Sequence, residues 1–170
     1  ELENTQLRKL IEEKDALKSN YIMSRVILDK QSIYLNSFII NVGGNKNIKN
    51  GMTVLDGPNF IGRIVDVNYF SSRVLLISDV NSMIPVVVSN NRIPSILIGE
   101  NLILPSLKFL PNNVKLNHGS IVQTSGHGGL LPAGLPIGTV VKHSSEKNYV
   151  KPLINLNLLF TSLESPLNLL

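Results

Sequence analysis

The chain contains no cysteine and no tryptophan, and only 5% of its 170 residues are aromatic. Without cysteine it can form no disulfide bond, thiolate metal site or cysteine nucleophile. Its few aromatic residues do not follow the stacking pattern of proteins that bind single-stranded nucleic acids. What remains is a chain that is 43% hydrophobic and long enough to bury a core, in one domain or two small ones.

Charge is also scarce, since charged residues make up 16% of the chain and leave a net charge of +4. Residues 1–30 contain six basic and six acidic side chains, so the whole excess lies in the remainder. There the lysines and arginines are spread singly and form no stripe. We therefore expect a mildly basic surface and no nucleic-acid partner.

Long apolar runs are absent: an unbroken run such as Val74–Ile77 has four residues, whereas a membrane span needs roughly 18. No span is expected within these residues. The sequence starts with Glu1 and reads from there like the middle of a helix. We therefore expect a fragment of a longer protein, with a membrane anchor or signal upstream.

Residues 1–22 lack glycine and proline, are rich in helix-forming residues and alternate in charge. Leu7, Leu10, Leu17 and Tyr21 fall on one seam, which Lys14 interrupts. This narrow stripe predicts the end of a longer coiled coil, and its residues are the candidate seam for self-association. The alternative is a single amphipathic helix that docks on its own domain.

After Tyr21 the chain consists of short runs of Val, Ile, Leu and Phe, separated by Gly, Asn, Ser and Pro. Runs of four to eight residues with many β-branched side chains predict a mainly β fold, a sandwich or small barrels. No later segment has a sustained helical period.

An internal repeat is the most informative feature of the sequence. Residues 50–67 match residues 118–143 when Gly51 is aligned with Gly119, and Gly62 then matches Gly138. Each copy predicts a strand, a tight turn that glycine permits, and a returning strand whose glycine allows close backbone approach. The second copy is eight residues longer. The repeat therefore predicts two similar β-modules in tandem.

The longer copy contains TSGHGGLLPAGLPIG, which superficially resembles the surroundings of a nucleophilic serine. The elbow motif G-x-S-x-G is absent around Ser125, because Gln123 and His127 occupy its glycine positions. No second catalytic element is evident, and neither a phosphate-binding loop nor a metal cluster is indicated. We therefore expect no catalytic residue, cofactor or metal.

The inserted residues display apolar side chains on a backbone that proline stiffens and in which glycine permits tight turns. The leucines either plug the open end of their own module or offer a docking surface for a partner, and we favour the plug. The residues of this structural or partner loop are Gly126, Gly129, Leu130, Leu131, Pro132, Gly134, Leu135 and Gly138.

The chain resembles the extracytoplasmic part of the bacterial rod-shape-determining MreC family. The resemblance rests on NVGGNKNIKNGMTVLDGPNFIGRIVDV, GSIVQTSGHGGLLPAGLPIGTVV and the closing VKPLINLNLLFTSL. Leu131 departs from the family, which usually has an aromatic residue there. Asn47 stands where glycine is common.

The resemblance implies a coiled-coil helix (1–22) followed by two small β-barrel-like modules, distantly like the halves of chymotrypsin. We expect an outer module from residues 23–48 and 106–165, an inner module from 49–105 inserted between its halves, and a tail at 166–170. In this arrangement residues near 26–45 pair with 119–163.

The family also implies a function: a non-enzymatic scaffold on the periplasmic face of the inner membrane, anchored by a single upstream span. Such scaffolds dimerise and bind a class B penicillin-binding transpeptidase, with MreD, RodA and MreB in the wider complex. Two alternatives are a degenerate serine hydrolase and a β-barrel module that binds glycan or peptide.

Overall fold

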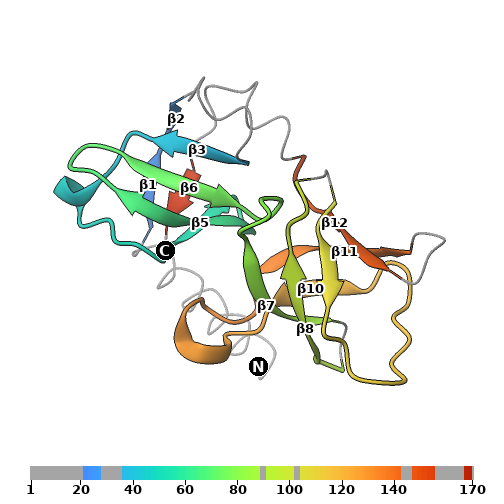
Figure 1. Cartoon of the computed structure of the whole chain (residues 1–170). Coiled ribbons are helices and arrows are strands. Elements are labelled where there is room, and N and C mark those ends of the chain that lie inside the picture. The colour runs from blue at the N-terminus through green and yellow to red at the C-terminus, as the bar shows by residue number, and fades with distance from the viewer. Residues whose placement is uncertain are drawn as a thin grey trace, which may run out of the picture.

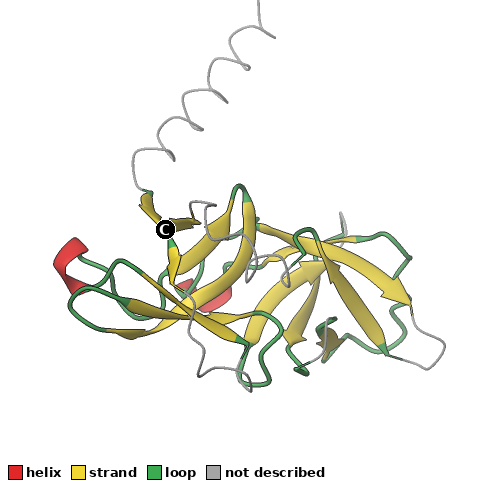
Figure 2. Ribbon diagram, turned by 90° about the horizontal axis from the view of Figure 1, so that it is seen from above, coloured by secondary structure: helices red, strands yellow, loops and turns green. Residues whose placement is uncertain are grey.

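The computed structural model describes residues 21–27, 36–88, 91–101, 104–142, 147–155 and 167–169. These residues form two β-modules that lie side by side (Figures 1 and 2). The first is an open seven-stranded sheet in the order β1-β13-β4-β5-β6-β3-β2, and the second is a closed six-stranded barrel. The prediction of a mainly β fold with small barrel-like modules is confirmed, although only one module closes.

The open sheet contains β1 (Ile22–Ser24), β2 (Val26–Ile27), β3 (Ser37–Ile40), β4 (Thr53–Asp56), β5 (Asn59–Val67), β6 (Ser72–Leu76) and β13 (Leu167–Leu169). The barrel contains β7 (Met83–Val88), β8 (Ile93–Ile98), β9 (Ser106–Lys108), β10 (Ile121–Thr124), β11 (Pro136–Lys142) and β12 (Asn148–Pro152). Two short 3₁₀ helices complete the described elements, η1 (Gly44–Lys46) and η2 (His127–Gly129).

The internal repeat corresponds to two equivalent hairpins, β4–β5 and β10–β11. Val54 pairs with Gly62 in the first and Val122 with Gly138 in the second, and both hairpins have a register shift directly after the valine. The amide of Gly51 donates to the carbonyl of Ile64 at 2.8 Å. In the second copy, the amide of Gly119 donates to Val140 at the same distance.

The glycines of the returning strands have the close backbone approach that the sequence predicts. A Cβ atom on Gly62 would lie 2.2 Å from the carbonyl oxygen of Leu75, on β6. A Cβ atom on Gly138 would lie 2.3 Å from the carbonyl oxygen of Lys151, on β12. Any side chain there would push the neighbouring strand away.

The expected module boundaries are wrong. Residues 26–45 do not pair with 119–163 among the described strands; instead β3 pairs with β2 and with β6. Within the expected inner module (49–105), β4–β6 belong to the open sheet, whereas β7 and β8 belong to the barrel. The repeat covers only one hairpin per module, so it did not reveal which distant strands complete each module.

The barrel, not the open sheet, is the inserted unit. The expected tail at 166–170 contains β13, which pairs with β1 and β4 and so returns the chain to the open sheet. Figure 1 shows this red strand among the blue and green ones. Among the described strands, β1 and β2 form the two edges of this sheet and do not pair with each other, whereas β7 pairs with β10 and closes the barrel.

Most of the expected helix, residues 1–20, lies outside the described residues. Its expected end at residue 22 is wrong, since Ile22 begins β1.

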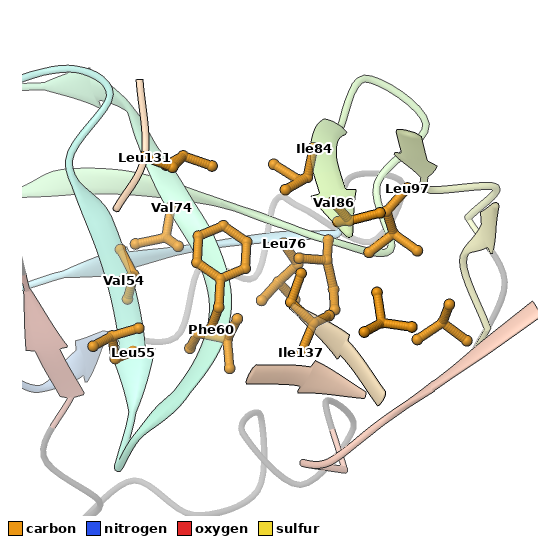
Figure 3. Close-up of a cluster of buried hydrophobic side chains, with 14 of the residues drawn as sticks. Val54, Leu55, Phe60, Val74, Leu76, Ile84, Val86, Leu97, Leu131 and Ile137 are labelled. Atoms are coloured by element: carbon orange, nitrogen blue, oxygen red, sulfur yellow. The ribbon is translucent and has the colours of Figure 1, made fainter. Parts of the chain in front are cut away.

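One continuous cluster of buried hydrophobic side chains runs through both modules (Figure 3). It forms because apolar residues alternate along the strands: on β7, Ile84, Val86 and Val88 are buried while Met83 is exposed. Both modules therefore share one core.

The segment that links the modules, residues 77–82, is fixed by the fully buried carboxylate of Asp79. The backbone amides of Asn36 and Asn81 donate to this carboxylate at 3.1 and 2.8 Å. On the other side, Gly99 approaches so closely that a Cβ atom would lie 2.0 Å from the Asp79 carbonyl oxygen. The junction is thus tightly packed and fully bonded.

Candidate partner-binding loop

The loop between β10 and β11, residues 125–135, is closed at its neck by Thr124. This side chain is fully buried. Its hydroxyl donates to the carbonyl of Pro132 at 2.6 Å and accepts from the amide of Leu135 at 2.9 Å. The backbone of Thr124 also bonds to Leu135 and Gly134. One buried hydroxyl therefore ties both ends of the loop together.

Gly126 is required where the two sides of the neck cross. It has φ 71°, in the left-handed region, and a Cβ atom there would lie 2.6 Å from the Cβ of Ala133. Gly129 and Gly134 also have positive φ. A side chain at Gly126 would both strain the backbone and open the neck.

The three leucines of the loop differ in burial. Leu131 is 9% exposed and joins the shared core, where Figure 3 shows it near Val74 of the open sheet, and Leu135 packs half-buried against the same core. Leu130 is 72% exposed. Leu131 and Leu135 thus have the burial that the predicted plug requires and Leu130 does not, while a plug of the loop's own module stays a prediction. Two leucines hold the loop down, and the third, beside the exposed Pro132, faces solvent.

Ser125 acts as a turn residue. Its hydroxyl accepts a hydrogen bond from the backbone amide of His127 at 3.0 Å, and its own amide donates to the carbonyl of Pro85 on β7 at 3.0 Å. The His127 side chain is exposed, as is that of His118. No group of histidine and carboxylate side chains suited to a metal ion occurs in the described part of the chain.

The predicted dimer seam is described only at Tyr21. This residue is half-buried and packs against the shared core. Leu7, Leu10 and Leu17 lie outside the described residues.

Sequence reasoning missed three exposed aromatic residues. Tyr69 and Phe70 form an edge-to-face pair, with ring centroids 4.6 Å apart, at the tip of the β5–β6 hairpin. Phe109 directly follows β9. The available signal was the position of aromatic residues within turn-forming stretches, NYFSS and KFLPNN.

Comparisons with known proteins agree on one family. A family model described as the barrel core of the rod shape-determining protein MreC matches residues 26–164. The cell shape-determining protein MreC of Cereibacter sphaeroides is 36% identical over 125 residues, which are 74% of this chain and 42% of that protein. The Escherichia coli protein of the same name is 30% identical over 150 residues, 86% of this chain and 41% of that protein. The chain thus spans less than half of these relatives.

Solved structures share the fold. The crystal structure of MreC from Pseudomonas aeruginosa aligns with a TM-score of 0.74 at 24% identity, covering 89% of this chain and 99% of that one. MreC in a complex with the penicillin-binding protein PBP2 from Helicobacter pylori aligns with a TM-score of 0.67 at 18% identity, covering 88% of this chain and 96% of that one.

The described helices are too short to cross a membrane. The matched family model, the sequence relatives and the shared two-module fold all lead to one assignment. The chain belongs to the rod shape-determining MreC family and comprises its barrel core.

Proposed function

We propose that this chain is a non-enzymatic scaffold of the cell-wall elongation machinery, which binds a class B penicillin-binding transpeptidase through the loop between β10 and β11. The observation that carries the proposal is the fixed presentation of Leu130. Its side chain is 72% exposed, while Thr124 and Leu131 hold the loop from inside. A preorganised apolar side chain loses little entropy when a partner covers it.

A scaffold also suits the surroundings of Ser125. A nucleophilic serine needs an imidazole base within hydrogen-bond reach. The hydroxyl of Ser125 instead accepts from a backbone amide. The complex of an MreC with PBP2 in another bacterium supports the choice of partner class.

The wider assembly follows from the family. We propose that residues 1–20 form the end of a coiled coil, that the chain dimerises through Leu7, Leu10, Leu17 and Tyr21, and that an upstream span anchors it at the periplasmic face of the inner membrane. MreD, RodA and MreB would belong to the same complex. The distant likeness of the modules to chymotrypsin halves stays part of this proposal.

Calorimetric titration tests the partner. The chain should bind the purified periplasmic part of the class B transpeptidase from the same organism with a Kd between about 1 and 50 μM, a range typical of weak contacts. Heat changes no larger than buffer dilution at 100 μM would overturn the proposal. A fluorophosphonate probe that labels the wild type but not Ser125→Ala would show an enzyme instead.

Ultracentrifugation tests the dimer separately. Leu10→Asp combined with Leu17→Asp should convert a dimer into a monomer, because two charges in a hydrophobic seam abolish its packing. The β-sheet signal in circular dichroism should not change. A species of unchanged mass would exclude the seam.

A further inference from the structure

Phe109 combines high exposure with an unusual backbone. Its side chain is 77% exposed, the largest fraction among the large hydrophobic residues in the described part of the chain. Its φ of 60° lies in the left-handed region, which is uncommon for a bulky residue without a functional reason. The fold therefore holds an apolar ring out in water at a conformational cost.

The backbone directly before Phe109 is held by the neighbouring strand. The hydroxyl of Ser95, on β8, donates to the carbonyl of Lys108 at 2.8 Å, directly before Phe109. Beyond the ring, Leu110 and Val114 pack against the shared core. The loop is thus attached to the core by Leu110 and Val114, and its exposed ring lies near its start.

The charged residues that the structure describes around this loop are all positive. Residues 109–114 carry no charged side chain, and the exposed Lys108 and Lys115 bound them. Arg92, also exposed, directly precedes β8. The antiparallel β9 runs toward that end of β8 and stops with Lys108 opposite Ile96. Within the described residues of 83–155 the one carboxylate is Glu100, and it accepts a hydrogen bond from the hydroxyl of Ser106 at 2.7 Å.

The other aromatic tip of the molecule has a different environment. Tyr69 and Phe70 are about equally exposed, at 68% and 71%. Their hairpin also carries the exposed Asp66, which pairs in register with Arg73. The amide of Asn45 in η1, next to the exposed Lys46, donates to the carbonyl of Tyr69 at 3.0 Å. This tip therefore has a similar aromatic surface beside charges of both signs, and it serves as an internal control.

We propose that the end of the barrel formed by Phe109, Lys108, Lys115 and Arg92 docks on an anionic phospholipid surface. A single ring can enter the boundary between headgroups and acyl chains, while long basic side chains reach the phosphates around it. Separated cations around one ring suit many mobile phosphates better than the fitted pocket of a protein partner. The surface is separate from the loop that carries Leu130.

The absence of tryptophan from the chain allows a direct test. Phe109→Trp introduces a single tryptophan at the proposed contact, and Phe70→Trp places one at the control tip; either can be excited apart from the four tyrosines. With vesicles of phosphatidylethanolamine and phosphatidylglycerol (3:1), the emission of Phe109→Trp should shift to shorter wavelength. The Phe70→Trp variant should not shift, and neither should respond to pure phosphatidylcholine.

Sedimentation of the 170-residue chain with the same vesicles measures the contribution of each group. Phe109→Asn removes the ring at a backbone conformation that asparagine tolerates, and should weaken binding about tenfold or more. Lys108→Gln and Lys115→Gln should each weaken it about fivefold. Lys46→Gln, in η1, should change nothing.

Two results would overturn the proposal. One is equal emission shifts at the two tips, which would indicate unspecific adsorption. The other is failure of the wild-type chain to bind the vesicles. If Phe109→Asn also loses transpeptidase binding, this end of the barrel is a protein contact. Binding of the transpeptidase by Phe109→Asn with wild-type affinity is expected, so the two surfaces can be judged independently.

Discussion

The two modules start from the same hairpin and diverge at its turn. In the open sheet, Asp56 and Asn59 pair across Gly57 and Pro58, a two-residue turn in which Gly57 has positive φ. In the barrel, Thr124 occupies the position equivalent to Asp56, and the chain makes an eleven-residue excursion, 125–135, before β11. One module thus keeps the minimal turn, and the other extends it into the loop that we propose as a binding surface.

The strands on either side of the long loop have the same features as those of the short hairpin. Both hairpins have the bulge, the hydrogen bond donated by the amide of the first glycine, and the close backbone approach at the second glycine. The longer loop adds its own support, since Thr124 and Leu131 stabilise it. Variants at equivalent positions can therefore test the equivalence itself.

The largest effect is expected from the close-approach glycines. Gly62→Ala and Gly138→Ala should each cost about 3–5 kcal/mol of unfolding free energy, because a Cβ atom would displace a backbone carbonyl. Urea unfolding followed by circular dichroism measures both. A large cost at one position and less than about 0.5 kcal/mol at the other would show that the modules are not equivalent.

The second effect concerns the loop leucines. Leu131→Ala should cost about 2–3 kcal/mol, because it leaves a cavity in the shared core. Leu130→Ala, its exposed neighbour and matched control, should stay within about 0.5 kcal/mol. Similar losses in the two variants, measured by urea unfolding, would contradict the assigned orientations.

The third effect distinguishes the neck from the short turn. Thr124→Val should cost about 1–2 kcal/mol, because it leaves the amide of Leu135 and the carbonyl of Pro132 without their hydroxyl partner. Hydrogen exchange should accelerate at the amide of Leu135. Thr124→Ser is the control, since it keeps the hydroxyl, and equal exchange in all three proteins would exclude the neck.

The smallest effect concerns Asp56, the counterpart of Thr124 in the short hairpin. Burial raises the pKa of this carboxyl above its ordinary value of 3.8. The folded state therefore binds a proton more readily than the unfolded chain, and stability falls as pH rises from 3.8 through the raised pKa. Above that window the penalty for the buried charge remains.

Asp56→Asn should remove this dependence. We expect only a small gain at pH 7, because solvent screens the partly exposed carboxylate, and none below pH 3, since the carboxyl is then protonated in both states. Urea unfolding at the two pH values compares the variant with the wild type. A loss of stability at pH 7 would mean that the charge is favourable in the turn.

The sequence predicted the local features of this fold well. Glycine spacing located both hairpins, and the alternation of apolar residues identified a β protein. The partition into modules was not predictable, because β13 and β3 reach their partners through pairings far apart in sequence. The prediction of burial was wrong for Leu130. Leu130 and Leu131 are adjacent and chemically identical, and only the backbone of the loop decides which one faces the core.

The site was predicted as a segment but not in its mechanism. The motif from Thr124 to Gly138 identified the loop, yet the double role of the Thr124 hydroxyl depends on its burial. Phe109 gave a weaker signal, an aromatic residue among turn-forming ones. Its left-handed backbone depends on how β9 ends against β8.

The most direct test of the account is the affinity of Leu130→Ser for the periplasmic part of the class B transpeptidase, measured by calorimetry beside the wild type. Leu153→Ser, which alters an exposed residue just after β12, is the control. The account predicts that Leu130→Ser weakens binding at least tenfold with unchanged thermal unfolding, and that the control binds like the wild type. Wild-type affinity in Leu130→Ser would contradict it.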